Sequence, residues 1–578
     1  MPVSPGASGG EPAVQAAPTM TAPRPFEWVT FGVSAALIAC AVAALWVWIP
    51  PAYDTNDDAT IRGVLEGTRI PGEPPTGFAL LPHAALGWLI VGVRSIWPMA
   101  YAWDIAVTGT LLLGLAVFAS LVWRSGSTPG FRLGTVATAF TAWLPLVSSV
   151  QYTISATIAG GAAVAVAWFE LQDHGSRRHT VLAMAGALFV LALLLRSGGA
   201  MAGALAACAC LLPHAIRARR RGVTIIGALL GGSIVLFGVL HAGDVILYKL
   251  HPEWDAYRQL NYFITAMFDW NWQTVLPSAV DITGARRAVG WTSSDWSLLE
   301  HAWGVNPDLY NLERVRTFYE STVGQITSWD YVIVALRRLW TFDRENLTER
   351  LTEAWPVLAA LAVVIAFYSR RRDFRVALAV ALSFVAYCVV VQAAFKSLPF
   401  RLLAPMVGCF VAVALSTMQS RPAGKVLASF CLLILFALCG YQTYSVLTGM
   451  AANHRHSLQV DAEGAALAAL GPSLVVIHTD TFPEEHWQRP FHRPDVRLLM
   501  IRLGRNNQNP QLLSFLEKAG LLAFPAAICD HPSIFVISEQ GRLEVVSIGL
   551  QERGRDITWN PVYTASFRAW QCLPAAAD

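Results

Sequence analysis

Three carboxylates stand close together in a short polar stretch directly after the first long apolar run of the sequence. Asp54, Asp57 and Asp58 follow within ten residues of the end of this run. Charge beside hydrocarbon costs free energy, so proteins place it there for function or in pairs. A carboxylate held beside an acceptor hydroxyl can take its proton as a new bond forms. We therefore expect Asp57 or Asp58 to act as a general base at the mouth of a membrane helix.

The same cluster allows two other interpretations. Asn56, Asp57 or Asp58 could be the N-cap of a helix over residues 59–66, because short polar side chains accept bonds from the first free N–H groups of a helix. Clustered carboxylates also offer the oxygen ligands that Mg²⁺ or Mn²⁺ takes. No cofactor is certain from the sequence, and a divalent metal is the one that these residues would allow.

Basic residues at the outer ends of predicted helices are candidates for binding a phosphate. Arg196 and Arg401 stand at such ends, and Lys396 precedes Arg401 closely. A guanidinium binds phosphate through two parallel hydrogen bonds and stays charged at every relevant pH. The alternative is that these side chains only extend to the membrane interface.

Aromatic and amide side chains form a third candidate group. Trp254, Tyr257 and Asn261 are spaced to lie on one face of a helix, where rings could stack on a sugar and an amide could bind it. The alternative is an amphipathic helix at the interface. A second polar and aromatic stretch, with Trp291 and Asp295, could close the same cavity. We expect these residues, together with Asp54, to bind the sugar or the acceptor.

The composition is that of an integral membrane protein. Of 578 residues, 54% are hydrophobic and 14% are charged, whereas about 25% of residues are charged in a soluble domain. The net charge of +3 says little about partners, and no basic run indicates nucleic-acid binding, because the topology of a membrane protein explains the Arg clusters better. The sequence also contains no phosphate loop and no dinucleotide-binding fingerprint, so nothing indicates nucleotide use.

Apolar runs predict an α-helical polytopic membrane domain with about eleven transmembrane helices. A run of about 20 apolar residues is long enough to cross a bilayer. Segment 77–97 is also apolar, but it contains Pro82, His83 and Arg94, and we interpret it as a helix on the membrane surface rather than a span. The eleven predicted spans are residues 27–49, 103–123, 133–149, 152–170, 180–195, 198–214, 222–246, 354–369, 375–394, 401–418 and 425–447.

The distribution of Arg and Lys predicts the orientation. With 77–97 outside the count, the loops richest in Arg all fall on one side, which the positive-inside rule assigns to the cytoplasm together with the N-terminus. Residues 1–25 then form a disordered cytoplasmic tail, and 26–454 a membrane domain with large outer loops at 50–102 and 247–353. We expect the plasma (inner) membrane of a bacterium.

Residues 455–578 differ in character and predict an extracytoplasmic α/β domain. Apolar, β-branched runs at 474–477, 496–501, 533–537 and 543–548 are typical of strands. Residues 462–470 and 510–519 predict helices. Cys529 and Cys572 lie in this domain, where a disulfide is permitted. Both a disulfide and two unpaired buried thiols are compatible with the sequence.

Several of these features together resemble the C-type glycosyltransferase superfamily of membrane enzymes, within which an uncharacterised bacterial branch is most similar. The resemblance is carried by Asn56-Asp57-Asp58 after the first span, by Trp254, Tyr257 and Asn261 in a later loop, and by the turn Pro399-Phe400-Arg401. It implies transfer of a sugar from a polyprenyl-phosphate donor to a glycan, lipid or protein acceptor in the cell envelope. Asp57 or Asp58 would be the base, and Arg401, with Arg196 or Lys396, would bind the donor phosphate.

Two other classes of function compete with this interpretation. A transporter or lipid flippase would need broken or charged helices near the middle of the bilayer and often repeated halves, and the sequence shows no convincing repeat. A membrane-anchored assembly factor would act through its outer domain, and its function would then not depend on the aspartates.

Overall fold

The computed structural model describes most of the chain. The described residues are 27–70, 72–125, 129–172, 178–268, 282–323, 333, 355–366, 371–395, 400–417, 425–479, 481–494, 498–504 and 508–575. The predicted tail 1–25 and Lys396 lie outside these ranges.

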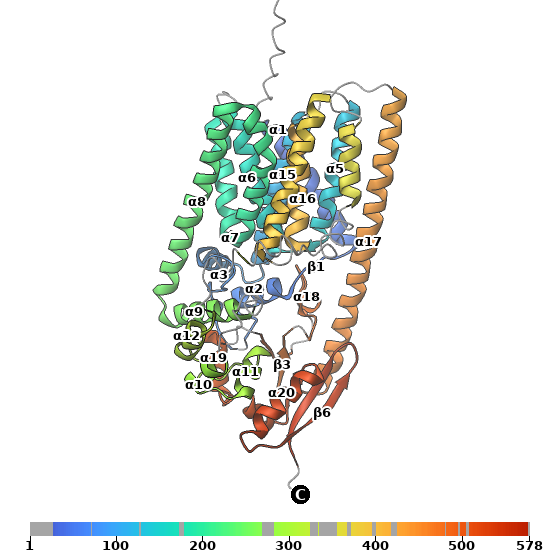
Figure 1. Ribbon diagram of the computed structural model, residues 1–578. Helices are drawn as coiled ribbons and strands as arrows, with labels where there is room; N and C mark the ends of the chain where they lie inside the picture. The colour runs from blue at the N-terminus through green and yellow to red at the C-terminus, as the bar shows by residue number, and fades with distance from the viewer. Residues whose placement is uncertain are drawn as a thin grey trace, which may run out of the picture.

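Long apolar helices form one bundle, which occupies the upper half of the molecule in Figure 1. Six of the described helices are long and apolar enough to cross a membrane. Each of the eleven predicted spans coincides, over its described residues, with a helix, and α7 covers two of them across a break at Arg196. The helices are α1 (Trp28–Trp48), α4 (Ala102–Ser125), α5 (Pro129–Val147), α6 (Tyr152–Gln172), α7 (Arg178–Arg217), α8 (Arg219–Lys249), Trp355–Ala366, α15 (Arg371–Phe395), α16 (Phe400–Thr417) and α17 (Lys425–Ala469).

Helices α6 and α7 pack closely at the centre of the bundle. A Cβ on Gly203 would lie 1.9 Å from the Thr157 carbonyl oxygen, and one on Gly160 would lie 2.4 Å from that of Ala200. Only glycine allows the two backbones to approach this closely, as is common between membrane helices. This contact fixes the N-terminal end of α6, which forms part of the site.

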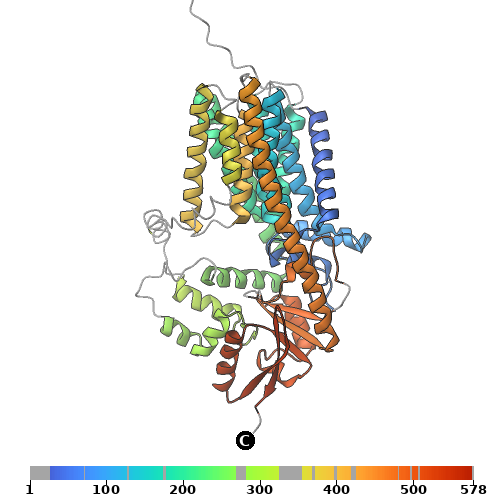
Figure 2. The same ribbon diagram turned by 90° about the vertical axis from the view of Figure 1, so that its right-hand side faces the viewer.

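The loops between the bundle helices fold into short helices below the bundle. The surface helix predicted at 77–97 is shorter in the structure, α3 (Ala84–Ile96), and it lies across the direction of the bundle at its lower end (Figure 2). The remaining helices are α2 (Asn56–Glu66), α9 (Pro252–Phe268), α10 (Ile282–Ala288), α11 (Ser293–Glu300) and α12 (Leu312–Ser321).

A five-stranded sheet in the order β4-β3-β5-β7-β6 forms the centre of the C-terminal domain. β3 pairs in parallel with β4 and β5, and β7 pairs antiparallel with β5 and β6. Leu474 and Val476 face one core, while Val475 and Ile477 face another that includes Val460 of α17. The elements are β3 (Leu474–His478), α18 (Glu484–Trp487), β4 (Met500–Leu503), α19 (Pro510–Lys518), η3 (Ala526–Asp530), β5 (Ile534–Ile537), α20 (Gln540–Gln551), β6 (Ile557–Thr564) and β7 (Arg568–Pro574).

One predicted strand of this domain is wrong. Residues 543–548 belong to helix α20, because Leu543, Val546 and Leu550 have helical spacing and are all buried. Strands β6 and β7 were not predicted. The helix expected at 462–470 is the end of α17, which continues from the bundle into the C-terminal domain (Figure 1). Of the two alternatives for Cys529 and Cys572, the structure contains the disulfide, which joins η3 to β7.

Candidate active site

A short parallel strand pair places the aspartate loop beside the start of α6. Ala52 of β1 (Ala52–Tyr53) pairs with Ser149 of β2 (Ser149–Val150), and Tyr53 pairs with Val150. The Asp54 N–H then donates to the Val150 carbonyl over 3.3 Å. The end of α1 and the junction of α5 and α6 therefore meet where α2 begins.

Helix α2 begins earlier than the sequence predicted. Its N-cap is Thr55, whose side chain makes no capping hydrogen bond, so the expectation that Asn56, Asp57 or Asp58 is the cap was wrong. Asp57 and Asp58 instead lie in the first turn, where negative charge interacts favourably with the helix dipole. Gly67 ends the helix in the left-handed conformation, with φ of 68°.

Asp57 lies at the open side of the site and faces Arg401. Its Oδ2 is 3.6 Å from Nη1 of Arg401, and both side chains are partly exposed, Asp57 by 46% and Arg401 by 37%. A pair that is exposed to this extent contributes little to stability. The two charges are therefore available to other partners.

Asp58, the next residue, is fully buried. Its Oδ1 accepts a hydrogen bond of 3.2 Å from the Tyr152 N–H at the start of α6. Within the described part of the chain, its Oδ2 is buried and has no hydrogen-bond partner. Burial, and next to it the charge of Asp57, raises the pKa of Asp58 well above its ordinary value. Asp58 therefore joins α2 to α6.

The side chain of Arg196 lies beside Tyr152, at the start of α6. The break in α7 falls at Arg196, and its guanidinium lies 5.7 Å from the centre of the Tyr152 ring. The charges of Arg196, Arg401, Asp57 and Asp58 all act on the hydroxyl of Tyr152. The structure thus brings together both aspartates and both arginines that the sequence singled out, and it adds Tyr152 at the start of α6.

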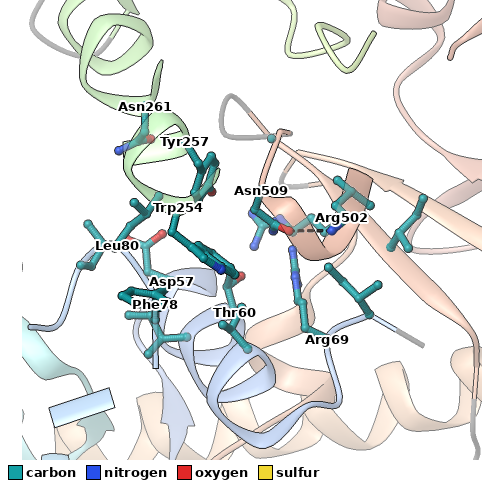
Figure 3. A pocket seen from close by; sticks show the side chains of 18 of the residues that line it. Asp57, Thr60, Arg69, Phe78, Leu80, Trp254, Tyr257, Asn261, Arg502 and Asn509 are labelled. Carbon is teal, nitrogen blue, oxygen red and sulfur yellow. Dashed lines mark hydrogen bonds between the residues drawn. The ribbon is translucent and has the colours of Figure 1, made fainter. Parts of the chain in front are cut away.

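A cavity of about 520 Å³ extends from Asp57 toward the C-terminal domain. Trp254, Tyr257 and Asn261, on one face of α9 as predicted, form one side of this cavity (Figure 3). Arg69 and Arg502 lie on the opposite side of it (Figure 3). The cavity therefore joins the loop after the first span, the loop between α8 and α12, and the C-terminal domain.

A second cavity, of about 570 Å³, adjoins the first and includes Arg196. Leu80, Leu81 and Asn261 line both cavities. The amide oxygen of Asn261 is buried and has no hydrogen-bond partner among the residues that the structure describes. Asn261 thus offers an unused acceptor at the wall between the two spaces.

Behind Asp57 and Asp58, the same helix takes part in a buried network of charges. Nε of Arg62 is 3.2 Å from Oε1 of Glu66, and its Nη1 is 3.6 Å from Oδ2 of Asp104. Asp104 also accepts from the Tyr53 hydroxyl and, over 2.9 Å, from the Phe491 N–H. Nη1 of Arg62 donates to the Arg489 carbonyl over 3.0 Å. Helix α2 is thereby tied to α4 and to a loop of the C-terminal domain.

Two residues predicted to bind the sugar or the acceptor do not reach either cavity. Trp291 is buried in another core, and its Nε1 donates to the Leu309 carbonyl over 2.8 Å. Asp295 completes the capping box of α11 with Thr292 and pairs with Arg553. The polar groups of both residues have partners within the fold. Asp54 is exposed beside the site but does not line the first cavity.

The predicted metal interpretation receives no support from the side-chain positions. In the ranges described above, no three His, Cys, Asp or Glu side chains come together as a metal site would require. Asp57 and Asp58, although adjacent, are directed to different partners, Arg401 and the Tyr152 N–H.

Comparison with known proteins gives only distant similarity. No family model and no curated protein matches the sequence. Two solved structures of ArnT from Cupriavidus metallidurans are similar over 94% of this chain and 98% of theirs. The structure bound to undecaprenyl phosphate has 13% identity and a TM-score of 0.34, and the apo structure has 12% identity and a TM-score of 0.36. Scores this low do not by themselves assign a fold or a function.

Proposed function

We propose that this protein is a membrane glycosyltransferase that moves a sugar from a polyprenyl-phosphate donor to an acceptor hydroxyl, with Asp57 as the general base. The observation that carries the proposal is the position of Asp57, which lines a large cavity and stands 3.6 Å from Arg401. The resemblance to C-type glycosyltransferases noted from the sequence supports the same chemistry.

Asp57 suits the role of base better than Asp58. A base must lie within hydrogen-bond distance of the proton that it removes, and only Asp57 lines the cavity. Asp58 is buried against the backbone of α6. Asp58 would therefore position α2, and Asp57 would act on the substrate.

Arg401 and Arg196 would bind the phosphate of the donor. As the acceptor oxygen attacks the anomeric carbon, the bond from this carbon to the phosphate oxygen breaks, and the polyprenyl phosphate leaves with the electron pair. Guanidinium groups placed where this negative charge develops would lower the barrier. Because the Asp57–Arg401 pair is partly exposed, a bound phosphate could take over Arg401 and leave the Asp57 carboxylate to accept the proton of the acceptor.

We further propose that the cavities and the C-terminal domain face outward, with the N-terminus in the cytoplasm. The Arg-rich ends of the helices support this orientation by the positive-inside rule. The disulfide between Cys529 and Cys572 supports it too, because disulfides persist outside the reducing cytoplasm.

Replacement of each aspartate tests the proposal. Transfer from a radiolabelled polyprenyl-phosphate sugar would be measured in membranes that contain the wild type, Asp57→Asn or Asp58→Asn. Asp57→Asn should lower turnover by about 10²–10⁴-fold, as expected for loss of a general base. Asp58→Asn is the matched control, because an amide oxygen can still accept from the Tyr152 N–H. Full transfer by Asp57→Asn would remove the base assignment.

A further inference from the structure

Three arginines from distant parts of the chain line the first cavity on the side of the C-terminal domain. Arg69 follows α2, Arg502 lies in β4 and Arg542 lies in α20. Among the described residues that line this cavity, Asp57 is the only acidic one, and its charge is opposed by Arg401. The surface of the cavity therefore has an excess of positive charge.

A buried carboxylate holds two of these guanidinium groups in place. Glu484 has a side chain that is only 3% exposed, and it receives Nη1 of Arg69 at 2.6 Å and Nη1 of Arg502 at 3.3 Å. One buried carboxylate thus orients two guanidinium groups, and Nε of Arg502 also donates to the Thr479 carbonyl over 3.0 Å. Glu484 does not line the cavity itself, whereas Arg69 and Arg502 both do.

Arg542 adds the third positive charge. It donates to the Thr479 hydroxyl, and its Nε lies 3.1 Å from Oε2 of Glu539. The Glu539 side chain is 66% exposed, so water screens this pair and a ligand could replace it. All three of these arginine side chains line the cavity, and each ends in a guanidinium, a group that binds carboxylate or phosphate through two parallel hydrogen bonds.

The opposite wall of the cavity is aromatic. Trp254 stacks on Phe78 with ring centres 5.3 Å apart, and Tyr257 packs edge-on against Trp254 at 6.0 Å. All three residues line the cavity, facing Arg69 and Arg502 across it (Figure 3). An aromatic wall with a polar edge suits a ligand that is apolar on one face and polar around its rim, as a sugar ring is.

We infer that this cavity binds an anionic saccharide, which is the acceptor if the protein is the glycosyltransferase proposed above. A sugar ring would lie against Trp254 and Tyr257, and its carboxylate or phosphate would pair with Arg69, Arg502 and Arg542. An acceptor hydroxyl would then point toward Asp57. The donor phosphate would use a different set of cations, Arg401 and Arg196.

Binding to the full-length protein in phosphatidylcholine nanodiscs, without a lipid-linked donor, tests this inference. The probes are cellobiose, the same disaccharide with a terminal glucuronic acid, and the same disaccharide with a 6-phosphate. At least one anionic probe should bind 10-fold or more tightly than cellobiose, and its affinity should fall as salt is added. The stronger of the two anionic probes identifies a carboxylate or a phosphate as the preferred group.

Substitutions locate the binding. Arg542→Gln is the first variant because its side chain is one-third exposed and its loss should not disturb folding. It should weaken the anionic probe by about 10-fold, which is the fold-change of losing one charge-assisted hydrogen bond, and leave cellobiose unchanged. Arg502→Gln should have at least the same effect. The control is Arg555→Gln, an equally exposed arginine that pairs with Asp530 elsewhere in the domain.

Three results would overturn the inference: equal affinity for neutral and anionic probes, binding of none of them, or an equal loss of affinity in Arg555→Gln. Because no donor is present and no bond is formed, these results are independent of the transfer assay with Asp57→Asn. An anionic acceptor site and a glycosyltransferase activity can therefore fail separately.

Discussion

Residues of helix α2 belong to two groups of charged side chains, and the two groups differ in how exposed they are. At its first turn, Asp57 and Arg401 are partly exposed and 3.6 Å apart. Further along, Arg62 and Glu66 have side chains that are only 4% and 2% exposed, and Asp104 is fully buried. Exposed pairs contribute little to folding, whereas a buried network is destabilised strongly when one partner is lost. The comparison separates charges that are accessible to other partners from charges that hold the helix in place.

Removal of Arg62 should have the largest effect on stability. Arg62→Met leaves the buried carboxylates of Glu66 and Asp104 without their shared cation, and we expect a loss of about 3–5 kcal/mol in the free energy of unfolding. Denaturant unfolding in detergent micelles measures it. A loss below about 1 kcal/mol would show that the buried network is not what fixes α2.

Removal of Arg401 should have little effect on stability and a large effect on sugar transfer. Arg401→Met should change the free energy of unfolding by no more than about 1 kcal/mol, because the pair with Asp57 is exposed. It should lower transfer by about 10²–10³-fold, as expected when a group that stabilises developing charge is lost. Transfer assays and denaturant unfolding of the same preparation test both expectations. A variant that loses stability but retains its turnover would contradict them.

Asp58 should show itself in the pH dependence of stability. Because burial raises the pKa of Asp58 in the folded protein, the folded state holds this proton more tightly than the unfolded state does. Its contribution is fully present below the ordinary aspartate pKa and is lost as the pH rises through the raised value. Asp58→Asn should remove this loss, so its melting temperature should fall less between pH 4 and pH 8 than that of the wild type. Parallel curves for the two proteins would contradict the assignment.

Arg493 provides the smallest and most discriminating test. It belongs to the buried network by its contact with Glu66 at 3.6 Å, but its own side chain is 31% exposed. If the exposure of a side chain, and not its membership in the buried network, decides how much it stabilises the fold, Arg493→Gln should lower the free energy of unfolding by only about 0–1 kcal/mol. Thermal unfolding of Arg493→Gln and Arg62→Met under the same conditions compares the two variants. Equal losses of stability would refute the role given to side-chain exposure.

The elements of the bundle could be predicted because their signal is local. A run of apolar residues has to be a helix in a bilayer, whatever surrounds it. The C-terminal domain was predicted less well. Residues 543–548 have the composition of a strand, but contact with the sheet buries Leu543 and Val546 on one face of a helix. Tertiary packing here overrides local preference.

Parts of the site were predictable for the same reason. Asp57, Arg196 and Arg401 were singled out because charge at the end of an apolar helix is conspicuous. Trp291 and Asp295 were also singled out, but the structure places them outside both cavities, where Trp291 donates to the Leu309 carbonyl and Asp295 completes a capping box. The sequence did not single out the three arginines that line the first cavity, Arg69, Arg502 and Arg542. Segments far apart in the sequence give no sign that their side chains share a cavity.

The sequence by itself determined that this chain is a polytopic helical membrane protein with charges at particular helix ends, since both properties depend on neighbouring residues. Tertiary structure alone decided which aspartate faces the cavity. Asp57 and Asp58 are adjacent and chemically identical, but successive residues of a helix point in different directions. The pairing of β1 with β2 sets how α2 is turned, so that Asp58 meets the Tyr152 N–H and Asp57 meets Arg401.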